Sequence, residues 1–263
     1  MSDERDEELI EQQREHFNAI AKRYEKGRQD RNHREIKRLI WQEALKPLNS
    51  LGPRITMLEP MCGYAEGLSL VREMTALQVD YHGFDYSDEI VGALEKRGVE
   101  GKIWQADATR FRPDLERYDL ILLIGGLHHV PRHARQVVKS LSAGLRPGGL
   151  FVNFEPTAGN PLFKAVREAI YRRNEIFDED TERAFGVGEL NGFFEQAGLE
   201  KERVLYPGLS AYTLYYNPYA FPGLNLGSPR AVRSFHRIDR LFQSNLIGRT
   251  LSFATLGIWK KPS

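Results

Sequence analysis

The chain has 263 residues, a formal net charge of +1 and a single cysteine. This length suits one α/β domain with added segments. The balanced charge gives no bulk electrostatic case for a nucleic-acid partner, because phosphate recognition normally requires a basic surface. The sequence contains no run of about eighteen apolar residues and no signal-like segment, so we expect no membrane span and a cytoplasmic location. Cys62 has no second cysteine with which to form an internal disulfide.

Helices are predicted over residues 5–48, ahead of a core over 49–263. Apolar residues recur at helical spacing around Phe17 and Tyr24, and again over 36–44. The stretch between these two faces is rich in Lys and Arg. A phosphate-binding patch is one interpretation of that charge, and a solvated helix face is the favoured one.

A strand, a tight turn and a helix are predicted over residues 54–70. Such a turn directs backbone N–H groups into a crevice at the carboxyl edge of a sheet, where a ligand with a ribose and a compact charge can bind. An acidic residue and three alternating positions define the turn: Glu59, Met61, Gly63 and Ala65. A dinucleotide fingerprint would require Gly or Ala at Glu66, so NAD and FAD are disfavoured. Cys62 is interpreted as a small packing residue rather than a nucleophile.

Two further strands are predicted to end in acidic residues. The second strand ends at Asp85, about twenty residues after the turn, where such folds hold ribose hydroxyls. A carboxylate there can accept hydrogen bonds from both hydroxyls, while Ser87 is the better helix cap. The third strand, over 101–106, is followed by Asp107. This residue either contacts a ligand or caps the short turn over 108–110, and both interpretations stay open.

The run over 118–126 is almost continuously apolar, which is typical of a parallel strand covered on both faces. The loop after it contains His128 and His129. A helix over 132–145, a turn over 146–149 and a fifth strand ending in Glu155 follow. A helix over 188–198, a sixth strand and a seventh strand over 251–260 complete the pattern.

Two insertions are predicted, over about 156–187 and 206–246. The first contains an amphipathic helix over 162–170. The second is rich in aromatic residues, including Tyr212 and Tyr216. Aromatic side chains with a polar tip suit the wall of an apolar pocket, which we favour, and also suit a homodimer interface.

In this order, these motifs resemble those of class I S-adenosylmethionine-dependent methyltransferases, in particular ubiquinone-biosynthesis-like and natural-product enzymes. The turn matches the family's first motif, although the family prefers Gly where this chain has Met61. The loop 127–131 and the turn 145–149 are similar to better-kept family features. The resemblance implies an α/β Rossmann-like fold with a mostly parallel seven-stranded sheet, helices on both faces, an N-terminal helical lid and insertions after strands five and six.

The resemblance also implies a cofactor, S-adenosyl-L-methionine, with S-adenosyl-L-homocysteine as product. Asp85 would bind the ribose, Asp107 the adenine amino group, and Tyr24 or Phe17 of the lid would cover the methionine end. The full set of residues expected to bind the cofactor is Glu59, Met61, Gly63, Ala65, Asp85, Tyr86, Asp107, Ala108, Gly125 and Tyr24.

Methyl transfer requires alignment of the acceptor and, for a hydroxyl, removal of a proton. Imidazole suits that task at neutral pH, and His129 is favoured as the base, with His128 close behind. The alternative is that both histidines only shape the loop. Glu155 is expected either to orient an imidazole or to contact the substrate. Tyr212 and Tyr216 are expected to contact the substrate. No metal is expected, because no acidic or Cys ligand stands beside His128, His129 and His133 in the sequence.

The predicted function is methyl transfer to a small, largely apolar acceptor, with oxygen favoured as the receiving atom. Carbon or nitrogen of a natural product or a lipid-linked sugar is the alternative. A family member that binds the cofactor without catalysis, and an NAD-type oxidoreductase, are the other classes considered.

Overall fold

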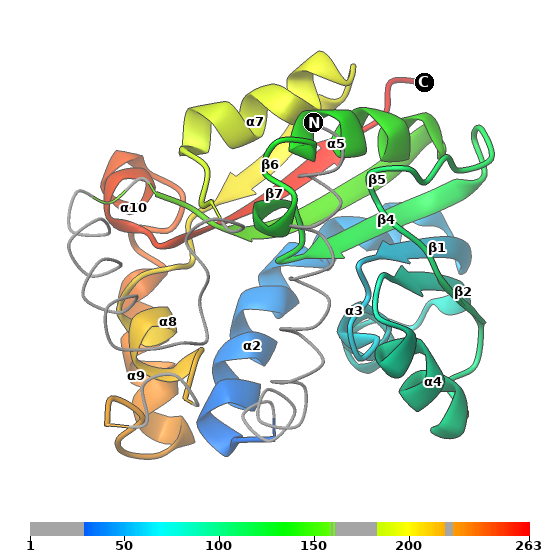
Figure 1. Ribbon diagram of the computed structural model, residues 1–263. Helices are drawn as coiled ribbons and strands as arrows, with labels where there is room; N and C mark the ends of the chain where they lie inside the picture. Colours follow the sequence, from blue (N-terminus) through cyan, green and yellow to red (C-terminus); the bar gives the residue numbers. More distant parts are fainter. Residues whose placement is uncertain (1–28, 159, 161–182, 219–222) are drawn as a thin grey trace, which may run out of the picture.

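The computed structural model describes residues 29–158, 160, 183–218 and 223–263. Their strands form one seven-stranded sheet in the order β3-β2-β1-β4-β5-β7-β6 (Figure 1). The strands are β1 (Arg54–Pro60), β2 (Gln78–Asp85), β3 (Lys102–Gln105), β4 (Tyr118–Ile124), β5 (Leu145–Pro156), β6 (Glu200–Leu205) and β7 (Ala254–Lys260). Strands β1 to β5 are parallel, and β7 is antiparallel to both of its neighbours. The predicted mostly parallel seven-stranded sheet is confirmed.

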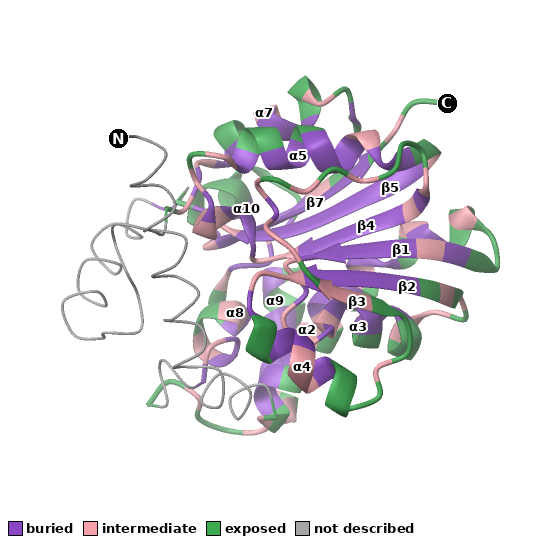
Figure 2. Ribbon diagram, turned by 45° about the vertical axis from the view of Figure 1, so that its right-hand side comes forward, coloured by how far each residue is buried: buried purple, intermediate pink, exposed green. Residues whose placement is uncertain are grey.

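Helices cover both faces of this sheet (Figures 1 and 2). On one face lie α2 (Arg31–Ala44), α3 (Glu66–Met74), α4 (Asp88–Lys96), α8 (Ser210–Tyr215) and α9 (Pro229–Asp239). On the other lie α5 (Ala134–Ala143) and α7 (Val187–Gln196). Shorter elements are η1 (Lys46–Leu51), η2 (Leu127–His129) and α10 (Leu246–Leu251). In the part of the chain described, no helix combines the length and the apolar character needed to cross a bilayer.

The sequence of β4 is continuously apolar because both faces of this strand are buried. Leu120 and Leu122 point to the core cluster that includes α2 and α3, whereas Ile121 and Leu123 point to the cluster that includes α5 and α7. All four side chains are completely buried. Alternate residues of a strand face opposite sides of the sheet, so both faces of β4 are covered.

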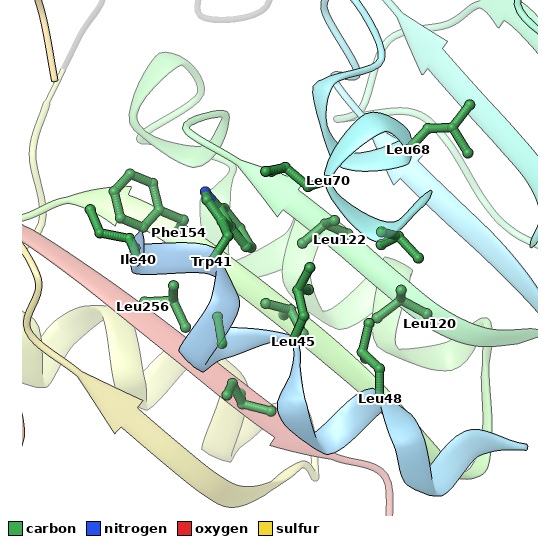
Figure 3. Packing of buried hydrophobic residues seen from close by; sticks show 14 of the residues in the cluster. Ile40, Trp41, Leu45, Leu48, Leu68, Leu70, Leu120, Leu122, Phe154 and Leu256 are labelled. Atoms are coloured by element: carbon green, nitrogen blue, oxygen red, sulfur yellow. The ribbon is translucent and has the colours of Figure 1, made fainter. Parts of the chain in front are cut away.

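Helix α2 packs against the sheet and contributes to its hydrophobic core. Ile36, Ile40 and Trp41 are buried in the same cluster as Phe154 of β5 and Leu256 of β7 (Figure 3). Residues 29–48 of the expected lid are described, and the boundary expected at residue 48 stays a prediction. Tyr24, Phe17 and the helix expected over 162–170 lie outside the described residues.

The turn between α5 and the fifth strand differs from the prediction. Helix α5 ends at Ala143, and β5 begins at Leu145, which pairs with Tyr118 before a shift in register. The expected turn over 146–149 therefore lies within the start of this strand. A Cβ at Gly149 would approach the Arg146 carbonyl oxygen to 2.9 Å, which explains the glycine.

The insertion after β6 folds onto α2. Asp239 of α9 caps the start of α8, accepting from the Ala211 backbone N–H at 2.7 Å and the Ser210 hydroxyl at 2.7 Å. The Tyr216 carbonyl lies 2.6 Å from His33 Nδ1 of α2. The insertion is therefore held to the N-terminal helix, beside the sheet.

Candidate active site

The turn after β1 contains three residues with left-handed backbone conformation. Their φ angles are 53° at Met61, 50° at Gly63 and 56° at Ala65. Non-glycine residues rarely adopt this conformation, and each one costs roughly 1 kcal/mol or more. The three alternating positions of the sequence motif thus share one backbone requirement, which explains why glycine suits all of them. Met61 and Ala65 meet it with strain.

Glu59 supports this turn from behind. Its carboxylate accepts from the backbone N–H groups of Gly67 at 2.7 Å and Leu68 at 3.1 Å, and from the Tyr81 hydroxyl at 2.9 Å. The side chain is 2% exposed, and burial raises its pKa to about 7. Glu59 therefore caps the first turn of α3. Its contacts are with protein groups, and direct binding of a cofactor by Glu59 stays a prediction.

Open space lies in front of the turn. Among the described residues, no heavy atom beyond the chain neighbours of Gly63 lies within 4 Å of its Cβ position. At Gly125, which follows β4 and also has positive φ (63°), the nearest such atom is His128 Cε1 at 3.7 Å. A ligand can therefore approach the backbone at the carboxyl ends of β1 and β4, where the parallel sheet changes direction of connection.

Asp85 faces this space from the end of β2. Its Oδ2 accepts from the Gly63 N–H at 2.9 Å, and its Oδ1 accepts from the Ser87 N–H at 3.0 Å. Burial raises the pKa of Asp85. The backbone N–H of Tyr86 also bonds to this carboxylate. A carboxylate offers about four lone-pair sites, so about one remains for a hydroxyl of a ligand. These residues fit a ribose-bearing cofactor.

Asp107 caps the turn that follows β3. Its Oδ1 accepts from both the backbone N–H and the hydroxyl of Thr109, each at 2.8 Å. Its Oδ2 is 3.7 Å from Arg110 Nε. The capping interpretation is therefore observed, while adenine binding by Asp107 stays a prediction. The neighbouring Ala108 is buried, and the Tyr86 carbonyl accepts from Gln105 Nε2 at 3.1 Å.

Glu155 and the histidine loop form the most connected polar group of the site. Glu155 is completely buried at the end of β5. Its Oε1 accepts from the backbone N–H groups of Gly126 and Leu127, both at 2.8 Å, and its Oε2 lies 2.8 Å from His128 Nδ1. The rings of His128 and His129 are 3.8 Å apart between centroids. One carboxylate thus fixes both the backbone of η2 and one imidazole.

This arrangement sets the tautomer of His128. An ionised carboxylate only accepts hydrogen bonds, so Nδ1 carries the hydrogen and Nε2 is the basic nitrogen of the neutral ring. Of the two roles expected for Glu155, its contacts are those of orientation. The sequence favoured His129 as the base, but the carboxylate contact is on His128.

Aromatic side chains border the same edge of the sheet. Tyr212 and Tyr216 are stacked, with ring centroids 4.5 Å apart, and both contact the ring of Phe154. The Phe154 carbonyl accepts from the Gly125 N–H at 2.7 Å. Phe154 therefore links the two tyrosines that were predicted for the substrate side to the ligand-accessible Gly125. Phe154 was not singled out in the sequence because it reads there as an ordinary strand residue.

Neither thiol nor metal chemistry is supported by the described residues. Burial, together with the carboxylates of Glu59 and Asp85, raises the pKa of Cys62, so its thiol stays protonated at neutral pH. No group of three or more His, Cys, Asp or Glu within the described ranges could hold a metal ion.

A contact that sequence reasoning missed is the ion pair between Lys37 of α2 and Glu66 of α3. Such a long-range pair has no local sequence signal.

Comparison with known proteins agrees with this geometry. Residues 57–149 match a family model described as a methyltransferase domain. A demethylmenaquinone methyltransferase of Bacillus cereus is 23% identical over 187 residues, which cover 62% of this chain and 78% of that protein. The Bacillus subtilis enzyme of the same name is 21% identical over 205 residues, covering 70% and 87%.

Solved structures show the same fold. An S-adenosylmethionine-dependent methyltransferase of Thermotoga maritima has a TM-score of 0.64 at 15% identity, covering 94% of this chain and 99% of that one. A phosphoethanolamine N-methyltransferase of Haemonchus contortus, solved with S-adenosylhomocysteine, has a TM-score of 0.58 at 14% identity, covering 85% and 53%.

The sheet order, the strained turn and the acidic residues at the strand ends define a class I methyltransferase fold. The family model matched over residues 57–149 is a methyltransferase domain, which supports that activity. Together with the relatives and the solved structures, this match supports a class I S-adenosylmethionine-dependent methyltransferase, as the resemblance of the motifs predicted.

Proposed function

We propose that this enzyme methylates a small, largely apolar acceptor, with a hydroxyl oxygen favoured, and that His128 removes the acceptor proton. The observation that carries the proposal is the pairing of the buried Glu155 with the partly exposed His128, beside Gly125. A base held by a carboxylate and placed next to a cofactor site has the arrangement that proton transfer requires.

S-adenosylmethionine supplies a methyl group that is activated by its positively charged sulfur. The turn at Gly63 and the carboxylate of Asp85 bind the cofactor and fix its position relative to η2. Glu155 keeps the His128 imidazole in the tautomer whose Nε2 can accept a proton, and it stabilises the imidazolium that forms. The aromatic residues of α8 and β5 exclude water from the acceptor. Alignment of the reacting atoms supplies most of the remaining acceleration.

The chemistry of the acceptor follows from the wall beside Gly125. Of the aromatic group Phe154, Tyr212 and Tyr216, only Tyr212 is partly exposed, and the other two rings are buried beside it. Such a group favours an apolar or aromatic molecule. The names of the relatives support the same class, since those enzymes are demethylmenaquinone methyltransferases. A second candidate is therefore transfer to a ring carbon of a quinol-type acceptor. The electron-rich carbon would form a bond to the methyl group as the bond between sulfur and methyl breaks, and His128 would then remove the proton from that carbon.

A labelled-methyl screen over hydroxylated aromatics, quinols, lipids and sugars tests the acceptor class. With the acceptor found, His128→Ala should lower turnover by about 10²–10⁴-fold and leave cofactor affinity within a few-fold. The wild-type rate should fall on the acidic side of the pH profile, as imidazole becomes protonated, and His128→Ala should lack that limb.

His129→Ala is the matched control and should lose much less turnover. If His129→Ala shows the larger loss, the base is the histidine that the sequence favoured. If neither single variant nor the double variant lowers turnover, catalysis depends on alignment alone. If labelled cofactor binds but methylates nothing in the screen, the non-catalytic alternative gains support.

The fold itself allows other chemistry. A [4+2]-cyclase shares it with a TM-score of 0.56 at 15% identity, covering 87% of this chain and 80% of that one.

A further inference from the structure

A group of apolar side chains that takes no part in the active site is exposed along α9 and α10. Leu241 is 70% exposed and Leu246 is 74% exposed, which is unusual for leucines of a folded domain. We call the group and its flanking arginines the α9–α10 surface. Its members are Phe235, Ile238, Leu241, Leu246, Ile247, Leu251, Arg230, Arg237 and Arg249.

Helix α9 separates these residues by type around its axis. Val232, His236 and Asp239 are buried against the protein at helical spacing. Phe235 and Ile238, three residues apart, form an exposed apolar flank. Arg230 and Arg237, seven residues apart, form an adjacent exposed basic flank. Phe235 contacts the ring of Tyr215 in α8, with centroids 6.2 Å apart. A surface helix with one face already buried needs only polar residues elsewhere, so packing within the described fold does not explain the exposed Ile238.

The charge of this surface is positive. The only acidic residue over 229–251 is Asp239, which is buried and bonded to α8. Within the described ranges, Arg230, Arg237 and Arg249 form no ion pair with a carboxylate, whereas the nearby Arg233 pairs with Glu35 at 3.0 Å. A protein with a net charge of only +1 therefore concentrates unpaired arginines beside exposed leucines.

The surface also lies close to the acceptor side of the sheet. The Leu251 carbonyl, at the end of α10, accepts from Asn160 Nδ2 at 2.7 Å. The adjoining Phe253 carbonyl accepts from the Thr157 N–H at 3.0 Å, two residues beyond Glu155. Figure 1 shows α10 beside the ends of β5 and β7, with α9 on the same side of the molecule.

We propose that the α9–α10 surface docks on an anionic lipid membrane. The apolar side chains enter the boundary between headgroups and acyl chains, and the arginines contact lipid phosphates. A second copy of the chain fits less well, because a twofold interface brings the same patch of each subunit together and would place arginine near arginine.

Co-sedimentation of the full chain with vesicles tests this inference. Wild type should bind vesicles of phosphatidylcholine with about 30% phosphatidylglycerol, should bind pure phosphatidylcholine much more weakly, and should be released by salt. The double variants Ile238→Ser/Leu246→Ser and Arg230→Gln/Arg237→Gln should each lower the partition coefficient at least tenfold. The arginine variant leaves every apolar side chain in place, so it guards against a folding defect.

Leu115→Ser is the matched control, because Leu115 is 76% exposed in the loop that leads into the amino end of β4. It should bind as wild type does. Unchanged partition of both double variants would overturn the proposal, as would equal binding to neutral and anionic vesicles. A wild-type dimer that the apolar variant converts to monomer, with no vesicle binding, would show a subunit interface instead. These measurements need no acceptor, so they are independent of the proposed reaction.

Discussion

The substitution Glu155→Gln separates the role of Glu155 in the fold from its role in setting the base. Oε1 of Glu155 accepts two backbone N–H groups, from Gly126 and Leu127, so a glutamine must keep its oxygen on that side. Its amide NH₂ then faces His128 Nδ1. Since that amide only donates there, Nδ1 becomes the acceptor and the ring hydrogen moves to Nε2. The proposed base is then occupied.

The expected losses follow from these contacts. Turnover should fall by about 10²–10⁴-fold, the range for removal of a general base. Stability should fall by only about 1–3 kcal/mol, because the three hydrogen bonds lose their charge assistance but not their partners. Glu155 acts through His128 and is a positioning residue, so a readout of the ring itself is needed as well.

Two measurements check this prediction. Single-turnover methyl transfer reports the chemical step, and nitrogen-15 NMR of the histidine ring reports which nitrogen carries the hydrogen. Asp119→Asn is a matched control, since Asp119 accepts from the Thr56 N–H at 2.7 Å and pairs with Arg146 at 3.0 Å, at the other end of β4. It should cost similar stability and leave turnover within about threefold. A Glu155→Gln variant with near wild-type turnover and an Nε2–H tautomer would refute the reasoning.

Three further outcomes are expected. Asp85→Ala should weaken S-adenosylhomocysteine binding by about 2–4 kcal/mol in calorimetry, because charge-assisted bonding to the ribose is lost. Alanine at the exposed Asp88 should leave that affinity unchanged. The pKa of Glu59 is raised to about 7, so its folded form holds the proton more tightly than the unfolded chain. Stability from this group is full below about pH 4.5 and falls by about 3 kcal/mol as pH rises to 7, a slope that urea titrations should find missing in Glu59→Gln. Trp41→Ala, which empties a fully buried site between α2 and the sheet, should cost about 3–5 kcal/mol by the same titrations.

The sheet could be predicted because its strands carry strong local signals. The apolar run of β4 and the turn at Gly63 each indicate their own conformation, and parallel strand ends necessarily meet at one edge. That geometry brings Glu155 and the histidine loop together, as expected. Which of His128 and His129 contacts Glu155 could not be predicted from the sequence. It depends on the orientation of η2, which is fixed by the hydrogen bonds from the Gly126 and Leu127 N–H groups to Glu155.

Other residues were harder to interpret for the same physical reason. An acidic residue at a strand end suits a ligand, but it equally suits the nearest unpaired backbone N–H groups. Glu59 bonds to the start of α3 and Asp107 to the turn at Thr109, and neither bond is visible in a spacing pattern. The apolar face of α2 was predicted, but its burial between Phe154 and Leu256 depends on chain segments more than a hundred residues away.

The position of β7 has a consequence for how the site assembles. This strand is inserted between β5 and β6, so the second edge of β5 stays open until residues 254–260 arrive. The hydroxyls of Thr157 and Thr255, 3.0 Å apart, join segments 98 residues distant in sequence. Contacts over such separations form late, because loop closure must be accomplished first. During synthesis the end of β5 that carries Glu155 therefore pairs with β7 only after residues 254–260 have been made, and until then its open edge can pair with other strands.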